Sequence, residues 1–298
     1  MEKVLVVSKE YCGQRLDKFL CSQLQPFSRT KIYRLVKDGL VSVDGKEKKV
    51  GFRLKLAQQV IVTIEEKRNE LKPFDFPVKI IYEDSDIIVV DKPLGLVVHP
   101  LQVSYHKTLV NALIHLKKEL APTGVLRPGI VHRLDKETSG VMVIAKNKSS
   151  YLGLVSQFKE RKVTKEYLAI SWGSLKEEKM LIDLPLSRDE KNRLKMKVNF
   201  LRAKQARTEV EVIARLRDST YLRLRPHTGR MHQIRVHLKF LNLPIVGDKK
   251  YGIEDEYKEL FLHAKELSFF HPQSAKRLKF SSPLPERFKK FLKENKMH

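Results

Sequence analysis

The residues best suited to chemistry lie in the segment 129–147, GIVHRLDKETSGVMVIAKN. It places one carboxylate, Asp135, just before an apolar run that predicts a β-strand, and surrounds it with the basic residues His132, Arg133 and Lys136. Cations beside a carboxylate favour its ionised form, which a nucleophile or a general base requires. Because a lone aspartate in a loop is more often a turn residue than a catalytic one, this segment needs a second signal.

Two residues later in the chain, Arg235 and Tyr167, supply that second signal. Residues 229–238, GRMHQIRVHL, have the apolar spacing of a helix, and Arg235 lies beside its core-facing stripe. A guanidinium near a core needs a carboxylate partner, and Asp135 is a plausible one. Tyr167 opens the predicted strand YLAISWG. It is either an ordinary strand aromatic or a residue that stacks on a base or accepts a proton.

The whole chain is strongly basic, with 59 Lys and Arg residues against 35 Asp and Glu residues and a net charge of +24. A folded protein with this excess usually has a polyanionic partner, which can be RNA, DNA or an anionic membrane surface. The composition therefore excludes a role in binding basic partners. With 42% hydrophobic residues among 298, the chain can bury a sizeable core, so the charge lies on a folded surface.

The sequence also suggests where the protein works. No apolar run is long enough to span a bilayer, and the first ten residues, MEKVLVVSKE, lack the apolar region of a signal peptide. We therefore expect a cytoplasmic protein that does not enter a membrane. Two cysteines, and histidines without metal-ligand spacing, predict reduced thiols and no metal site.

Residues 1–65 predict a small domain of two helices and a small sheet. Apolar spacing over 15–24 and a possible N-cap at Ser28 indicate the helices, and Asp44-Gly45 indicates a tight hairpin turn. The second helix carries four cations that form either a solvated face or an RNA-binding one: Arg29, Lys31, Arg34 and Lys37.

Residues 66–77, charged and containing two prolines, predict a linker to a larger domain over 78–298. In that domain, strand patterns at 78–93, 139–146, 167–173, 206–216 and 220–226 outnumber the helical patterns at 108–118, 150–161, 229–241 and 285–293. Because strands and helices do not alternate, we expect an α+β fold with a mixed, largely antiparallel sheet.

Several motifs together resemble a known family. HRLDKETSGVMVIAKN is preceded by DKPLGLVVHP and followed by VTKEYLA, PHTGRMHQIRVHL, GDKKYG and LHA. In this order, over about residues 79–282, they closely resemble the RluA family of RNA pseudouridine synthases. The earlier segment PFSRTKIYRLVKDGLVSVDG resembles an S4-type RNA-binding domain. The resemblance thus covers nearly the whole chain.

The resemblance implies roles for individual residues. It makes Asp135 the nucleophile, Tyr167 the active-site tyrosine and Arg235 the partner of the aspartate. Arg133 corresponds to the arginine that enters the helix as the target nucleotide leaves, and Arg230 is expected to contact RNA. Three routes stay open for Asp135: attack on the ribose C1′, attack on the base, or assistance of an elimination through a glycal.

The implied reaction is the isomerisation of uridine to pseudouridine, which needs no cofactor. Large-subunit ribosomal RNA is the expected substrate, and the expected state is a monomer. Three alternatives remain: a synthase acting on transfer RNA, a non-catalytic RNA-binding or ribosome-associated protein, and a nucleoside hydrolase that releases uracil.

Overall fold

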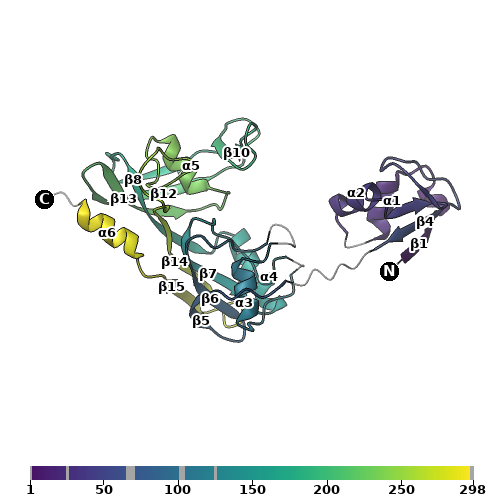
Figure 1. Cartoon of the computed structure of the whole chain (residues 1–298), viewed down its shortest axis with the longest axis horizontal. Helices are drawn as coiled ribbons and strands as arrows, with labels where there is room; N and C mark the ends of the chain where they lie inside the picture. Colours follow the sequence, from purple (N-terminus) through teal and green to yellow (C-terminus); the bar gives the residue numbers. More distant parts are fainter. Residues whose placement is uncertain (1, 25–26, 65–70, 101–104, 124–125, 296–298) are drawn as a thin grey trace. The chain divides into compact units, whose positions relative to one another are not determined.

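The computed structural model describes residues 2–24, 27–64, 71–100, 105–123 and 126–295. The chain divides into two compact units, residues 1–69 and 70–298 (Figure 1). The sequence pattern predicted that the large unit begins at residue 78, but the unit begins earlier. Phe74 and Phe76 stack on one another at a centroid distance of 5.3 Å and pack against the large unit's core. The second half of the predicted linker is thus part of this unit.

The small unit has the predicted two helices and small sheet. Its described elements are β1 (Glu2–Val6), the 3-10 turn η1 (Lys9–Tyr11), α1 (Leu16–Gln23), α2 (Arg29–Lys37), β2 (Val41–Val43), β3 (Lys46–Glu47) and β4 (Gln59–Thr63). The strands pair antiparallel in the order β1-β4-β2-β3. Ser28 caps α2 by accepting a hydrogen bond from the Lys31 N–H. Asp44 and Gly45 have φ of 50° and 73°, as a two-residue hairpin turn requires.

The large unit is built on one mixed sheet. Its described strands are β5 (Lys79–Glu83), β6 (Ile87–Lys92), β7 (Ser139–Ala145), β8 (Thr164–Trp172), β9 (Lys179–Asp183), β12 (Arg207–Arg215), β13 (Ser219–Pro226), β14 (Leu262–Phe270) and β15 (Arg277–Ser281). They run in the order β5-β6-β7-β14-β8-β13-β12-β9, with β15 also paired to β14. Among these strands only β7 and β14 pair in parallel, so the predicted α+β class is confirmed.

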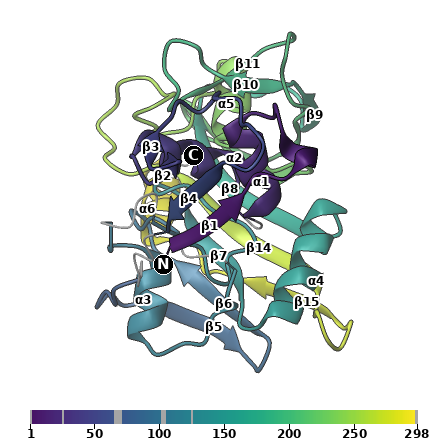
Figure 2. The ribbon, with the colours of Figure 1, turned by 90° about the vertical axis from the view of Figure 1, so that its right-hand side faces the viewer.

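Helices α3 (Leu109–His115) and α4 (Lys148–Lys159) cover opposite faces of the β5-β6-β7 part of the sheet (Figure 2). Alternate residues of β6 show this, because neighbouring side chains of a strand point to opposite faces. Val89 packs in the cluster that contains Leu154 of α4, whereas Val90 packs in the cluster that contains Leu109 of α3. This half of the sheet is therefore a three-layer scaffold, and it carries the loop with Asp135.

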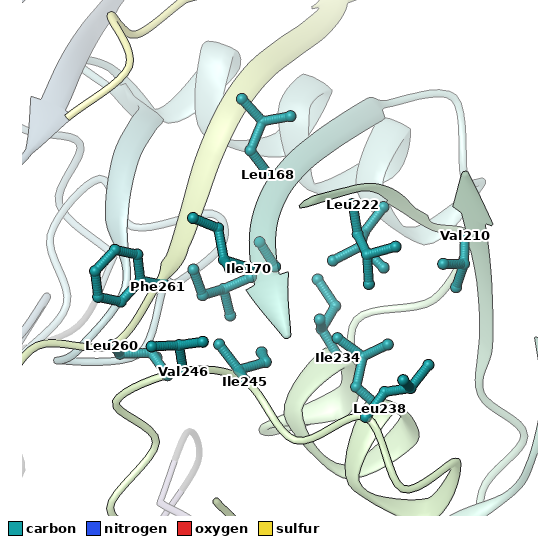
Figure 3. Packing of buried hydrophobic residues seen from close by; sticks show 14 of the residues in the cluster. Leu168, Ile170, Val210, Leu222, Ile234, Leu238, Ile245, Val246, Leu260 and Phe261 are labelled. Atoms are coloured by element: carbon teal, nitrogen blue, oxygen red, sulfur yellow. The ribbon is translucent and has the colours of Figure 1, made fainter. Parts of the chain in front are cut away.

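Helices α5 (Gln233–Phe240) and α6 (Glu286–Glu294) pack against the other half of the sheet. Figure 3 shows Ile234 and Leu238 of α5 beside Leu222 of β13 and Val210 of β12, all in one buried cluster. This packing confirms the core-facing stripe predicted for the segment.

The start of α5 corrects a prediction. The helix begins at Gln233 and not at residue 229, and His232 before it has a left-handed φ of 53°. The cause is the Gln233 side chain, whose Oε1 accepts hydrogen bonds from the Thr228 hydroxyl at 2.7 Å and the Arg230 N–H at 3.0 Å. These bonds fold residues 228–232 into a turn outside the helix.

Several strands were not predicted, namely β1, β9, β14, β15 and the hairpin of β10 (Leu186–Arg188) and β11 (Met196–Val198). Strand β14 shows why. It lies inside the sheet and is buried along most of its length, so the alternation of apolar and polar residues that marks a half-exposed strand is lost.

Candidate active site

The Asp135 loop is anchored at both ends. Leu134 is buried in the core beneath it, and the Thr138 N–H donates to the Asp135 carbonyl at 3.1 Å. Gly140 then enters β7 with a φ of +120°, where a Cβ atom would stand 2.2 Å from the Ala264 carbonyl oxygen of β14. Only glycine lets the two strands approach this closely. The TSG sequence after the aspartate therefore fixes where the carboxylate stands.

A buried lysine holds the loop from below. Lys92 at the end of β6 donates to the carbonyls of Pro93 at 2.8 Å, Leu96 at 2.9 Å and Lys136 at 3.3 Å. Burial lowers the pKa of Lys92 to about 7, while the nearby charge of Asp135 favours the ammonium. An ammonium has three donors, and here each has a carbonyl acceptor. Lys92 thus ties the 93–96 segment to the Asp135 loop.

Arg235 is buried but its principal partner is not the one predicted. Its Nε and Nη2 donate to both carboxylate oxygens of Asp248, at 2.8 and 2.6 Å, whereas Nη1 lies 3.5 Å from Asp135 Oδ2. The side chains of Arg235 and Asp248 are only 2% and 1% exposed. Burial alone would raise the pKa of Asp248, but the hydrogen bonds and charge of Arg235, together with the backbone N–H groups of Tyr251 and Lys250, lower that pKa. Asp248 therefore orients the guanidinium, while Nη1 donates to Glu137 Oε2 at 3.4 Å and also lies beside Asp135.

His232 forms a second contact to the Asp135 carboxylate. The Tyr251 hydroxyl accepts the Met196 N–H at 2.8 Å and shares a hydrogen bond of 2.7 Å with His232 Nδ1. Burial lowers the pKa of His232, which favours the neutral ring. Its Nε2 lies 3.9 Å from Asp135 Oδ2. The loop after Val246 thus supplies two supports, because Asp248 holds Arg235 and Tyr251 holds His232.

Tyr167 and Lys165 lie two positions apart on β8 and face the same cavity. Burial raises the pKa of Tyr167, and the charge of Asp135 raises it further, so the phenol stays protonated at neutral pH. Burial lowers the pKa of Lys165 to about 8. Beside them, His132 Nε2 accepts the Val143 N–H at 3.1 Å, and burial lowers its pKa to about 3. His132 is thus a neutral support.

These groups line one cavity of about 740 Å³. It is lined by every site residue that the sequence predicted in the large unit: Asp135, Tyr167, Arg235, Arg133 and Arg230. Among the described residues, a single carboxylate, that of Asp135, lines the cavity, against the cationic side chains of Arg133, Lys159, Arg161, Lys165, Arg188, Arg230 and Arg235. The field of these cationic side chains attracts a polyanion to the cavity that contains Asp135.

The four cations predicted in the small unit lie on the exposed side of α2, opposite its buried residues Ile32, Leu35 and Val36. Arg29 is partly engaged, because its Nη2 lies 3.1 Å from Asp17. Lys31 Nζ lies 3.5 Å from the centroid of the Phe27 ring. Arg34 and Lys37 project to solvent beside an exposed tyrosine, Tyr33. The face can therefore offer both charge and an aromatic ring.

One group of described side chains has metal-like spacing, and it lies outside the cavity. Ligand atoms of Asp84, Asp86 and His271 lie within 4.8 Å of one another. They already hydrogen bond within the protein, since Asp84 accepts from the Ile87 N–H and contacts His271 Nε2, and Asp86 accepts from Ser150. These hydrogen bonds give the three side chains a structural role in joining neighbouring segments of the large unit. No helix among the described residues is long and apolar enough to cross a membrane.

Several residues of the site were missed by sequence reasoning, although they belong to the motifs that carried the resemblance. Lys92 lies in DKPLGLVVHP, Lys165 in VTKEYLA, His232 in PHTGRMHQIRVHL, and Asp248 and Tyr251 in GDKKYG. The available signal was an ionisable residue inside each ordered motif. That signal does not tell which residue each of these side chains contacts, because every contact joins segments that are far apart in the chain.

A basic two-helix module and a cationic cavity around one carboxylate define an enzyme that acts on RNA. Residues 86–240 match the family model described as RNA pseudouridylate synthase, and residues 14–60 match the S4 domain. The chain belongs to the RNA pseudouridylate synthase family, and it carries an S4 domain at its N-terminal end. Membership of this family favours an enzyme over a non-catalytic RNA-binding protein.

Named relatives agree with this assignment. An uncharacterized RNA pseudouridine synthase of Bacillus subtilis, YlyB, is 40% identical over 288 residues, which cover 95% of this chain and 94% of the relative. Ribosomal large subunit pseudouridine synthase D of Neisseria meningitidis is 38% identical, over 95% of this chain and 79% of the relative. The structure of human RNA pseudouridylate synthase domain containing 1 aligns with a TM-score of 0.59 and 28% identity, over 70% of this chain and 84% of that chain.

Proposed function

We propose that the protein converts specific uridines of large-subunit ribosomal RNA to pseudouridine, with Asp135 as the catalytic carboxylate. The observation that carries this proposal is the cavity in which Asp135 faces Arg235, His232 and Tyr167. The substrate is inferred from relatives that are named ribosomal large subunit pseudouridine synthase D.

The isomerisation of uridine to pseudouridine requires few groups beyond these side chains. The C1′–N1 bond of the uridine breaks, the uracil turns, and a C1′–C5 bond forms while C5 loses a proton and N1 gains one. A carboxylate can act as the covalent or electrostatic partner without a cofactor. Arg235 Nη1 and His232 Nε2 approach the same Asp135 oxygen, Oδ2, and so hold the carboxylate ready to attack C1′, attack the base or assist an elimination. All three routes start from this arrangement.

The uridine must leave its stack to reach Asp135, at a cost of a few kcal/mol. Tyr167 is placed to stack on the uracil, and stacking on an aromatic ring is worth about 1–3 kcal/mol per base. Arg133 is exposed at the cavity and fits the role of filling the gap that the nucleotide leaves. Together the two side chains offset the cost of flipping.

The small unit would add affinity through phosphate contacts of α2, by Arg29, Lys31, Arg34 and Lys37. Such contacts position an RNA without reading its sequence. Site choice then falls to the large unit and to the shape of unpaired RNA. We further propose that the protein works as a cytoplasmic monomer, without a cofactor, a metal or a membrane.

Mapping pseudouridine at single-nucleotide resolution, in cells with and without the protein, tests the proposal. We expect one or a few large-subunit ribosomal uridines to lose the modification, and a plasmid copy to restore it. An unchanged ribosomal map together with lost positions in transfer RNA would move the substrate to transfer RNA. A map unchanged in every RNA would contradict the proposal.

A further inference from the structure

Lys165 is a cation in the cavity that the chemistry above does not use. Its side chain is half-buried on β8, and its Nζ makes one long hydrogen bond, to the Thr228 carbonyl at 3.4 Å. Within the described ranges 71–100, 105–123 and 126–295, no carboxylate lies within ion-pair distance of this nitrogen. An ammonium has three donors, so at least two of them still need acceptors.

The protein leaves space at this nitrogen and keeps competing charge away from it. A Cβ atom built on Gly229 would stand 3.9 Å from Lys165 Nζ and meet no other atom within 4 Å. Asp135 makes no ion pair with Lys165, and its Oδ2 is approached instead by Arg235 and His232. The neighbouring His132 is neutral and already accepts a backbone hydrogen bond. Lys165 thus faces an open part of the cavity.

The missing acceptor is best supplied by an anion. Burial already lowers the pKa of Lys165 to about 8, which means that the empty cavity disfavours the ammonium. A carbonyl oxygen of uracil carries no net charge and would restore little of this cost. A phosphodiester would restore more, and the surrounding cations Arg133, Arg161 and Arg230 favour it further.

The spacing along β8 fits a nucleotide. Lys165 and Tyr167 lie on the same face, about 7 Å apart along the strand. This separation is comparable with that between a nucleobase and its own phosphate. A uracil stacked on Tyr167 would therefore bring a backbone phosphate of the same nucleotide towards Lys165.

We propose that Lys165 binds the backbone phosphate on one side of the flipped uridine, and so sets that nucleotide's register over Asp135. This inference rests on the proposed function. It makes Lys165 different from the exposed cations, because a desolvated contact is stronger and less screened than a surface one. It also predicts a preference for a uridine within an RNA chain over the free nucleoside.

A double-mutant cycle between protein and RNA tests the contact. The probe is a short synthetic RNA that carries the mapped uridine, prepared unmodified, with a neutral methylphosphonate on its 5′ side, or with one on its 3′ side. Wild-type protein and Lys165→Met are compared in single-turnover reactions. We expect Lys165→Met to lower kcat/KM for the unmodified RNA by about 10- to 100-fold, the worth of a hydrogen bond to a charged group.

The diagnostic result is the coupling. At one of the two linkages, the methylphosphonate should harm the wild type by a similar factor and harm Lys165→Met by less than about threefold. Lys165→Arg should retain most of the wild-type activity, because it keeps the charge. Lys162→Met is the matched control, since Lys162 lies outside the cavity and pairs with Glu160 at 2.7 Å. Its effects should be small and uncoupled.

Independent effects at both linkages, with an active wild type, would overturn the role of Lys165 and leave the proposed function intact. The same cycle measured on Kd does not depend on turnover, so it tests the contact even if no product forms. A wild type that makes no pseudouridine would instead contradict the proposed function. Lys165→Gln serves as a second neutral variant if thermal melting shows that Lys165→Met does not fold.

Discussion

The two regions that carry basic residues use them in opposite ways. On α2 of the small unit the cations are exposed, and even Arg29, which contacts Asp17, has a side chain that is 69% exposed. In the cavity of the large unit, Arg235 is 2% exposed and is held by both oxygens of Asp248. The first arrangement leaves long side chains free to follow a phosphate backbone. The second fixes one guanidinium on Asp248, with its Nη1 beside Asp135.

The difference in exposure predicts that the two sets of cations have different roles, one in RNA affinity and the other in the reaction. Exposed charges act through a screened field, so they strengthen RNA binding in a salt-dependent way and tolerate substitution. Buried charges act at short range and in one geometry, and removing one of them leaves its partner unpaired. Substitutions in the cavity should therefore change activity or folding, whereas substitutions on α2 should change only binding.

The largest effect is expected at Asp135. Asp135→Asn keeps the size of the side chain but removes the carboxylate, so we expect pseudouridine formation to fall by at least about 10³-fold. RNA affinity should stay within a few fold, because the cations of the cavity and of α2 are unchanged. Single-turnover kinetics and a binding titration on the same RNA measure both. An Asp135→Asn protein that binds no RNA would show that binding and chemistry are not separate here.

Arg235→Ala should come next. It leaves the buried Asp248 carboxylate without its partner, so we expect a loss of about 3–5 kcal/mol in the free energy of unfolding, together with lost activity. Urea unfolding measures the first. Adding Asp248→Ala should recover part of that stability without restoring activity. Arg217→Ala, which removes an arginine paired with Asp218 where both side chains are exposed, is the control and should change stability little. Equal losses of stability for Arg235→Ala and Arg217→Ala would contradict the distinction between buried and exposed cations.

Lys92→Met should destabilise the protein by about 3 kcal/mol, because the three carbonyls that Lys92 joins lose their donor. One of those carbonyls belongs to Lys136, next to Asp135, so kcat should fall while KM for RNA changes little. Denaturant unfolding and steady-state kinetics together check this. If kcat for the folded variant equals that of the wild type, Lys92 does not position the catalytic loop.

The pH dependence of RNA binding in the cavity follows from Lys165. Its pKa in the free protein is lowered to about 8, so the ammonium is lost as pH rises through that value. We therefore expect kcat/KM to fall by up to about tenfold per unit above pH 8, and Lys165→Arg to abolish this fall because an arginine stays charged. The effect on folding has the opposite sign. The unfolded chain binds the proton more tightly, so this group favours the folded state increasingly between about pH 8 and its ordinary pKa.

The smallest effect is expected on the small unit. Arg34→Ala combined with Lys37→Ala should weaken RNA binding only a few fold and reduce the slope of log K against log salt by about 2, one for each lost phosphate contact. Turnover at saturating RNA should not change. Titrations at several salt concentrations test this. An unchanged slope would mean that this face of α2 does not contact phosphates.

The sequence predicted which residues line this cavity better than it predicted their contacts. Asp135, Tyr167 and Arg235 were identified because they lie in long ordered motifs, and the structure places all three at one cavity. The partner of Arg235 was predicted as Asp135, whereas the bidentate partner is Asp248. Pairing between segments that are distant in the chain leaves no local pattern, so it had to come from the structure.

The start of helix α5 and the position of strand β14 also differ from the prediction, each for its own reason. The helix predicted from residue 229 starts at Gln233 because one glutamine side chain satisfies the turn before it. Strand β14 was missed because its burial removes the alternating pattern. The two helices and the hairpin of the small unit were predicted because their signals are local, in the cap at Ser28 and the turn at Asp44-Gly45.

In the proposed reaction, Asp135 drives an isomerisation in which nothing but the C5 proton leaves the uracil. Its most direct test is a large-subunit ribosomal transcript labelled with tritium at C5 of uridine, incubated with the wild type or with Asp135→Asn. We expect the wild type to release one tritium for each pseudouridine formed and no free uracil, and Asp135→Asn to release neither. Free uracil from the wild type, which a nucleoside hydrolase would produce, or tritium release by Asp135→Asn would contradict this proposal.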